Sequence, residues 1–417
     1  MNILRRTATV LKLLFATIID FIFGKKPPKP SKNISTVAEL EEYIDSVVKM
    51  NRPPGLSIAV VKDGRMVYNK TFGLADGPGK VPATNETVYH WMSMTKMTTA
   101  VSIMHLQDQG KLNIDDPVEK YLPFFKVKHR SEDGEVITIR HLLNHSSGLA
   151  NPPGMLGLIH LDGESHPNQV RLAEKLMSTN QRLAFETGTQ ATYSNLNYTV
   201  LGAIIEKVSG ITHREYVVQN IFLPLKMNNT NFVYNDLMLE HAAVGSQPNG
   251  NILSVMLAVL VSNLSRIIRE TVKGRMWFNK VYPDFTGAAG VIGPANETAR
   301  FVMAFLNKGE LDGERILSSE SVRIMTNDSH VKGKGGPATF YKGVLHGLGW
   351  LIWNDVERKR IMHSGDGPGF SGIMQLFPEE NLGVIVQGNE WAYGVSFRST
   401  SIRDSIAALA AGLEWDD

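Results

Sequence analysis

The sequence predicts a mixed α/β protein in which one antiparallel sheet, built from both ends of the chain, is flanked by helices and carries an inserted, mainly helical region. Short β-type runs occur near the start of the chain, at residues 56–73, and again between residues 347 and 390. Amphipathic helical patterns fill most of the chain between these two groups of predicted strands. We therefore expect residues 36–417 to form one composite domain.

The composition limits the classes of function. Apolar residues make up 43% of the 417 residues, which is enough for a large core. Lys and Arg number 43 against 41 Asp and Glu, so the chain lacks the basic excess of nucleic-acid-binding proteins, and we predict no nucleic-acid partner. The chain contains no cysteine, which excludes disulfides, thiolate nucleophiles and zinc–thiolate sites.

The first 26 residues differ from the rest of the chain, and the proline-rich residues 27–35 that follow are typical of an extended polar linker. At 100° per residue, residues 1–26 form an amphipathic helix. We predict that this helix lies in a membrane interface, with Lys25 and Lys26 available to anionic headgroups. The alternatives are an atypical export signal or a helix packed on the body. The polar side holds Arg5, Arg6, Lys12 and Asp20, and the apolar side holds Ile3, Leu4, Leu11, Leu14, Phe15, Ile18 and Ile22.

The elements of the main domain follow from local patterns. Apolar residues at helical spacing predict a helix over residues 36–50, and β-rich runs around Asp63-Gly64 predict a hairpin. Further helices are predicted from Ser93 to about Gly110, over residues 197–210 and over residues 399–413.

A middle segment, residues 251–270, carries a near-continuous apolar run of about ten residues, which is shorter than the ~20 that span a bilayer. The simplest prediction is a buried helix. The alternative is a lid or interfacial helix beside a binding site, which would suit a lipid-like substrate.

Ser93 and Lys96 give the first chemical signal. Residues three apart on a helix share one face, so a lysine amine can touch the serine hydroxyl. A desolvated amine has a lowered pKa and can act as a base, and a serine at a helix N-terminus lies near N–H groups that stabilise an oxyanion. The sequence holds three Ser-x-x-Lys matches, but only this one opens a helix with a strong apolar face. The others are Ser46/Lys49 and Ser329/Lys332.

Two further motifs lie downstream. Tyr193-Ser194-Asn195 is the only Tyr-x-Asn in the chain, and a tyrosine beside a lysine can serve as general acid and base. His363-Ser364-Gly365 is the only [His/Lys]-[Ser/Thr]-Gly match, and a glycine at a strand edge lets the backbone approach a ligand. Taken alone, the first motif is also compatible with a buried tyrosine beside a turn asparagine, and the second with a hairpin turn.

In this order, the three motifs resemble those of serine β-lactamases and penicillin-binding proteins. The Tyr-x-Asn form is similar to the class C β-lactamase branch, which includes D,D-peptidases and family VIII carboxylesterases. The resemblance covers roughly residues 36–410, and it implies a β-lactamase/transpeptidase-like fold. It also implies an acyl-enzyme mechanism with no metal and no organic cofactor.

The resemblance implies a role for each motif residue. Ser93 would be the acylated nucleophile, and Lys96 and Tyr193 would share the acid and base work, with the sequence leaving open which is the general base. Asn195 would orient the substrate and Lys96. The strand edge of the pocket would be lined by His363, Ser364 and Gly365. The oxyanion would bind the backbone N–H groups of Ser93 and Asp366.

Departures from the family pattern bear on the substrate. β-Lactamases usually carry a lysine where this chain has His363, whose charge near neutral pH the sequence leaves open. Asp366 beside the motif adds a negative charge, which disfavours an anionic substrate. We therefore expect an esterase- or amidase-type serine hydrolase acting on a small acyl substrate. The alternatives are a D,D-peptidase or β-lactamase, and, in another class, a non-catalytic binding relative.

Overall fold

The computed structural model describes residues 2–23, 34–162, 164, 166–250, 252–261, 264–327, 331–332, 344–353, 358–391 and 402–415. Most of the predicted linker lies outside these ranges, as does Ser329 of the third Ser-x-x-Lys match.

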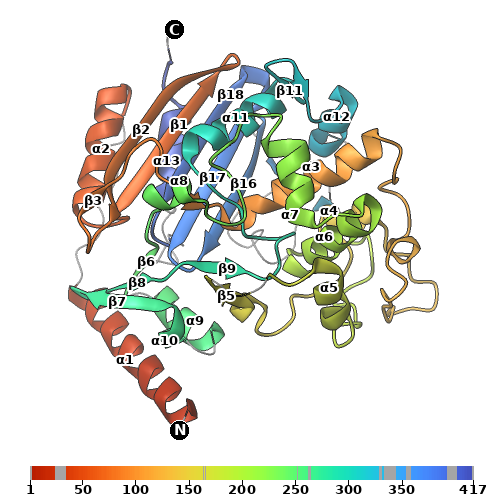
Figure 1. The fold of residues 1–417 in the computed structure, drawn as a ribbon, viewed down its shortest axis with the longest axis horizontal. Helices are drawn as coiled ribbons and strands as arrows, with labels where there is room; N and C mark the ends of the chain where they lie inside the picture. The colour runs from red at the N-terminus through yellow and green to blue at the C-terminus, as the bar shows by residue number, and fades with distance from the viewer. Residues whose placement is uncertain are drawn as a thin grey trace.

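Among the described residues, nine antiparallel strands form the main sheet in the order β13-β14-β15-β16-β17-β18-β1-β2-β3. Strand β1 from the start of the chain pairs with β18 from its end (Figure 1). The predicted sheet built from both chain ends, with helices around it, is confirmed. The strands are β1 (Gly55–Lys62), β2 (Arg65–Asp76), β3 (Val81–Pro82), β13 (Val331–Lys332), β14 (Leu345–His346), β15 (Leu351–Trp353), β16 (Arg360–Gly367), β17 (Phe370–Phe377) and β18 (Leu382–Gly388).

Strand β1 shows why both faces of this sheet are covered. Ala59 and Val61 belong to one core cluster and Ile58 and Val60 to another, because successive side chains point to opposite faces. The predicted hairpin turn between β1 and β2 is present, with Asp63 at φ 50° and Gly64 at φ 76°. Two positive φ values are typical of the tight turn whose twist matches a hairpin.

Helices pack on both faces of the main sheet. On one face α13 contacts β17 and β18 and α2 contacts β2, while on the other α11 contacts β1 and β18. The mainly helical region lies beyond α11, to the right in Figure 1. The helices are α2 (Val37–Lys49), α3 (Thr95–Asp108), α4 (Ile139–Leu143), α5 (Gln169–Met177), α6 (Asn195–Ser209), α7 (His213–Val217), α8 (Asp236–Glu240), α11 (Ala295–Leu306), α12 (Ser319–Asn327) and α13 (Ile402–Ala411).

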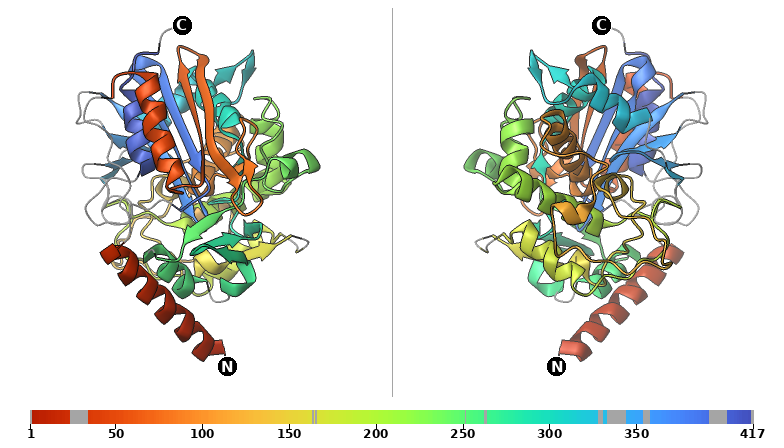
Figure 2. Two further views of the ribbon diagram at one scale, coloured as in Figure 1. Left: turned by 90° about the vertical axis from the view of Figure 1, so that its left-hand side faces the viewer. Right: turned by 90° about the vertical axis from the view of Figure 1, so that its right-hand side faces the viewer.

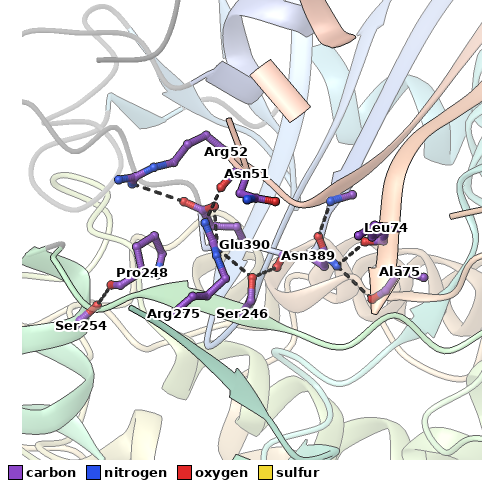
Figure 3. A network of polar contacts seen from close by, with 11 residues as sticks. Asn51, Arg52, Leu74, Ala75, Ser246, Pro248, Ser254, Arg275, Asn389 and Glu390 are labelled. Carbon is purple, nitrogen blue, oxygen red and sulfur yellow. Dashed lines mark hydrogen bonds and ion pairs between the residues drawn. The ribbon is translucent and has the colours of Figure 1, made fainter. Parts of the chain in front are cut away.

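A small third layer lies below the sheet in Figure 1. It is attached to the sheet in part by a buried ion pair, Arg275 Nη1 to Glu390 Oε2 at 3.0 Å (Figure 3). The layer contains α1 (Asn2–Phe23), α9 (Ile252–Leu260), α10 (Leu264–Ile267), β5 (Ile159–Leu161), β6 (Ser246–Pro248), β7 (Ile268–Val272), β8 (Arg275–Phe278) and β9 (Val281–Pro283). The remaining short strands are β4 (Tyr89–His90), β10 (Ile292–Gly293), β11 (Glu310–Leu311) and β12 (Glu314–Arg315).

Of the two apolar segments of this layer, the N-terminal one forms the predicted helix and the middle one differs from the simplest expectation. The N-terminal segment is helical, and Leu13 of α1 packs in one apolar cluster with residues of α9. The middle segment is two helices and a strand, and α9 is not wholly buried, because Met256 is 42% and Val259 51% exposed. No helix in the described part of the chain is both long and apolar enough to cross a bilayer.

Candidate active site

Ser93 and Lys96 lie on one helical turn. The 3₁₀ turn η1 (Met92–Met94) runs directly into α3, so residues three apart face the same side. Lys96 Nζ lies 3.1 Å from Ser93 Oγ. The structure therefore brings together the two side chains that the Ser-x-x-Lys spacing pairs.

The turn that carries Ser93 is pressed against strand β16. A Cβ on Gly365 would lie 1.9 Å from the carbonyl oxygen of Trp91, so only glycine permits this approach. Met92, directly before Ser93, has φ 49°, a left-handed conformation that is costly for a residue with a side chain. Its buried side chain packs beside Gly367. The strand thus fixes the backbone directly before the serine.

Lys96 is fully buried, with 0% of its surface exposed. Besides Ser93 Oγ, its Nζ contacts Asn195 Oδ1 at 2.8 Å and the carbonyl oxygen of Ala288 at 2.9 Å. Burial holds the pKa of this amine well below its usual range, because desolvation penalises the ammonium form.

These contacts determine the direction in which the lone pair of a neutral Lys96 amine points. An amide oxygen and a backbone carbonyl can only accept, so Asn195 and Ala288 take the two N–H groups of the amine. The remaining position on Nζ faces Ser93 Oγ, whose hydroxyl can then donate to it. A serine that donates to an amine lone pair is arranged to lose its proton.

The aromatic ring of Tyr193 lies beside the amine of Lys96. Lys96 Nζ lies 4.7 Å from the centroid of the Tyr193 ring, which is half-buried. Asn195 is the first residue of α6, and its backbone N–H donates to Asn151 Oδ1 at 2.6 Å. The second predicted motif is therefore in direct contact with the first, with Asn195 holding the amine and Tyr193 lying against it.

His363 lies on the face of β16 that looks toward Ser93. Its neighbour on that face, Ile361, belongs to the core cluster that contains Met94 and Met97. The ring centroid of His363 is 6.3 Å from that of Tyr193, and Nδ1 donates to the carbonyl of Ser364 at 2.7 Å. Burial, with Lys96 nearby, lowers the pKa of His363 to about 3. The third motif therefore presents a neutral imidazole.

Ser364 and Asp366 occupy the alternate positions of β16, whose side chains point to the other face of the sheet. Asp366 Oδ2 accepts from Arg403 Nη1 of α13 at 2.8 Å. Burial raises the pKa of Asp366 to about 6, against the opposing effect of Arg403. The expectation that Asp366 adds negative charge to the pocket is wrong, because its side chain is paired on the far side of the strand.

His145 and His346 were not singled out from the sequence. His145 Nδ1 accepts from the backbone N–H of Ser194 at 3.2 Å, and its ring lies 4.7 Å from that of Tyr193. The ring of His346 meets His145 edge-on at 5.5 Å, and its buried Nε2 has no hydrogen-bond partner among the described residues. Burial lowers both pKa values, that of His346 to about 4.

His145 and His363 therefore both lie beside the Tyr193 ring, and His346 contacts His145. His145 follows Asn144 in a stretch similar to a recurrent family segment, but its contact with Tyr193 spans 48 residues of sequence and has no local signal. Within the described ranges, no group of three or more His, Asp or Glu side chains is placed to hold a metal ion.

A model of the beta-lactamase family matches residues 40–408. Protein flp from Staphylococcus aureus (strain MRSA252) is 26% identical over 352 residues, which cover 84% of this chain and 62% of that protein. Penicillin-binding protein 4* from Bacillus subtilis (strain 168) is 27% identical over 342 residues, covering 80% of this chain and 68% of that protein. The part of the chain that matches Protein flp thus spans less than two thirds of that relative's length.

Solved structures show the same similarity. The octameric penicillin-binding protein homologue from Pyrococcus abyssi superposes with a TM-score of 0.68 at 28% identity, covering 91% of this chain and 78% of that one. A D-stereospecific amidohydrolase from Streptomyces sp. superposes with a TM-score of 0.62 at 21% identity, covering 85% and 95%. The second similarity supports the fold alone.

Proposed function

Because the chain belongs to the beta-lactamase family, we propose that it is a serine hydrolase that acts on an ester or amide through an acyl-enzyme. The observation that carries this proposal is the 3.1 Å contact of Ser93 Oγ with the fully buried amine of Lys96, whose pKa is held well below its usual range by desolvation. A binding protein has no use for a desolvated lysine whose lone pair faces a serine hydroxyl, and burying such a group costs stability. The alternative of a non-catalytic relative is therefore disfavoured.

In the acylation step, Lys96 accepts the proton of Ser93 as Oγ forms a bond to the carbonyl carbon of the substrate. The oxyanion is stabilised by the backbone N–H groups of Ser93 and Asp366. The bond to the leaving group then breaks, and Tyr193 gives the leaving atom a proton that Lys96 replaces. In deacylation, water attacks the acyl carbon while Tyr193 takes a proton from the water and passes its own to Lys96. Lys96 then returns a proton to Ser93 Oγ as the bond between Oγ and the acyl group breaks.

The neutral third motif favours an ester or amide without a carboxylate at that position. His363, with its pKa lowered to about 3, offers no fixed cation to bind an anionic group. Asp366 is turned toward Arg403, so its carboxyl does not repel such a group either. Substrate choice at this edge then depends on the hydrogen bonds that His363 offers.

A D,D-peptidase or β-lactamase activity is the second candidate. The observation in its favour is the similarity to Penicillin-binding protein 4* over 80% of this chain. Both candidates share the same nucleophile and acyl-enzyme, so only the substrate separates them.

The experiment has two parts. Labelling with a fluorophosphonate tests the nucleophile. We expect the purified chain to be labelled and the Ser93→Ala variant not to be; equal labelling of both would remove Ser93 from the mechanism.

A substrate panel tests the class of substrate: short and long p-nitrophenyl esters, a D-amino-acid p-nitroanilide, a D-Ala-D-Ala peptide and nitrocefin. We expect kcat/KM to be highest for an ester or the anilide, and faster turnover of nitrocefin or the peptide would favour the second candidate.

A further inference from the structure

We propose that α1 and α9 together form a docking surface for an anionic lipid bilayer. The two helices pack on each other, with Val10 and Leu13 of α1 in the same apolar cluster as Leu253 and Leu257 of α9. Beyond this contact each helix leaves a row of apolar side chains exposed. We call these rows the α1–α9 face, which consists of Leu11, Leu14, Phe15, Ile18, Ile252, Met256 and Val259.

The α1–α9 face concentrates exposed apolar surface. On α1 the exposed fractions are 60% for Leu11, 67% for Phe15 and 56% for Ile18, at a spacing that puts them on one side of the helix. Of the thirteen large apolar side chains that are exposed among those the structure describes, seven belong to this face, four on α1 and three on α9. Single exposed apolar residues are ordinary, but such a concentration on two contacting helices indicates a binding surface.

The basic charge of the N-terminal segment favours an anionic lipid bilayer as the binding partner of this face. Residues 1–26 carry five basic residues and one acidic residue in the sequence. Lys12 is exposed on α1, between the apolar residues Leu11 and Leu13 along the chain. Anionic headgroups attract such a helix, whereas a second copy of the same basic segment is repelled.

The position of α1 suits contact with a flat surface. Figures 1 and 2 show α1 at the lower edge of the molecule, with its N-terminal end extending beyond the other elements. A bilayer can therefore meet this helix without first meeting the main sheet.

The face is also attached to the catalytic sheet. Ser254 of α9 donates a hydrogen bond to the carbonyl of Pro248 in β6, and Ser246 of β6 donates to the carbonyl of Asn389 at the end of β18 at 2.7 Å (Figure 3). Residues 281–283 of β9, in the same layer, lead within five residues to Ala288, whose carbonyl holds Lys96. Docking through this face would therefore set the orientation of the active site relative to the bilayer.

Vesicle co-sedimentation of the full chain tests the proposal. The protein is mixed with vesicles of phosphatidylcholine and phosphatidylserine or of phosphatidylcholine alone, and the Ser93→Ala variant is used in parallel to separate docking from hydrolysis. We expect binding to the mixed vesicles that weakens with salt. Removing one buried Phe- or Val-sized side chain costs about tenfold in partitioning, so Phe15→Gln and Val259→Gln should each bind about tenfold more weakly. Leu223→Gln, at an apolar residue 55% exposed on another surface, is the matched control and should bind normally.

Two outcomes overturn the proposal. The first is that Phe15→Gln and Val259→Gln bind the mixed vesicles as well as the unaltered chain. The second is that the chain does not bind vesicles and is instead a dimer by light scattering, which Phe15→Gln converts to monomers. That result would assign the face to contact with a second copy of the chain. Far-UV circular dichroism checks that each variant is folded. The two substitutions lie on different helices, so loss of one variant leaves the other as the test. Failure of the proposed hydrolase function would leave vesicle binding unchanged.

Discussion

Lys96 Nζ donates to the amide oxygen of Asn195 over 2.8 Å, so an uncharged acceptor, from a helix 99 residues along the chain, holds the amine that faces Ser93. An uncharged acceptor matters because a carboxylate at the same place would stabilise the ammonium form. The identity of residue 195 therefore sets whether Lys96 is available as a base.

Asn195→Asp is the direct test of this relationship. The new carboxylate would raise the pKa of Lys96 and keep the amine protonated, so we expect kcat/KM for an ester to fall about a hundredfold near neutral pH. The residual rate should climb more steeply with pH than that of the unaltered enzyme. Asn195→Ala removes the acceptor without adding charge, so a similar pH profile for both variants would contradict this account.

The buried amine also predicts how stability depends on pH. Burial lowers the pKa of Lys96 in the folded state below 10.5, so between these two values the unfolded chain binds one more proton than the folded one. The free energy of unfolding is therefore highest, as far as Lys96 is concerned, above the unfolded pKa. It falls as the pH decreases from there toward the folded pKa. Relative to Lys96→Met, the free energy of unfolding of the unaltered protein, measured in urea, should therefore rise by up to about 1.4 kcal/mol per pH unit as the pH approaches 10.5 from below. A difference that is constant with pH would show that Lys96 is protonated in the folded protein.

The Arg403–Asp366 pair predicts a stability effect away from the chemistry. Both side chains are less than 10% exposed, so Arg403→Met leaves a buried carboxyl without its partner and should lower the free energy of unfolding by about 3 kcal/mol at pH 8. The loss should shrink below pH 6, because the pKa of Asp366, about 6, allows the carboxyl to become neutral there. Asp366→Asn combined with Arg403→Met should recover part of the stability at pH 8. Equal losses at pH 8 and pH 5 would indicate lost packing alone.

His363→Lys tests the role of the third motif in substrate choice. A lysine there would add a cation facing the Ser93 side of β16, so kcat/KM for nitrocefin, which carries a carboxylate, should rise about tenfold relative to that for a neutral ester. His363→Gln keeps a neutral hydrogen-bonding side chain and is the matched control, with no gain expected. An equal change for both substrates would mean that charge at this position does not select the substrate.

Local patterns predicted much of this protein because their cause lies within a few residues. The spacing of Ser93 and Lys96 puts them on one helical turn wherever that helix sits in the fold. The turn at Asp63-Gly64 follows equally from residues that tolerate positive φ. The order of the three motifs predicted the family, and the β-type runs near both chain ends predicted the sheet; both predictions are confirmed.

The tertiary structure decided what depends on contacts between distant segments. It made His363 neutral by burying it beside Lys96, turned Asp366 toward Arg403, and supplied Ala288 as the second acceptor for the amine. These outcomes depend on desolvation and on which face of a strand meets which helix, and neither quantity is present in a short stretch of sequence. The same division holds for α1, whose amphipathic pattern is local, whereas its packing against α9 is a contact between segments some 240 residues apart.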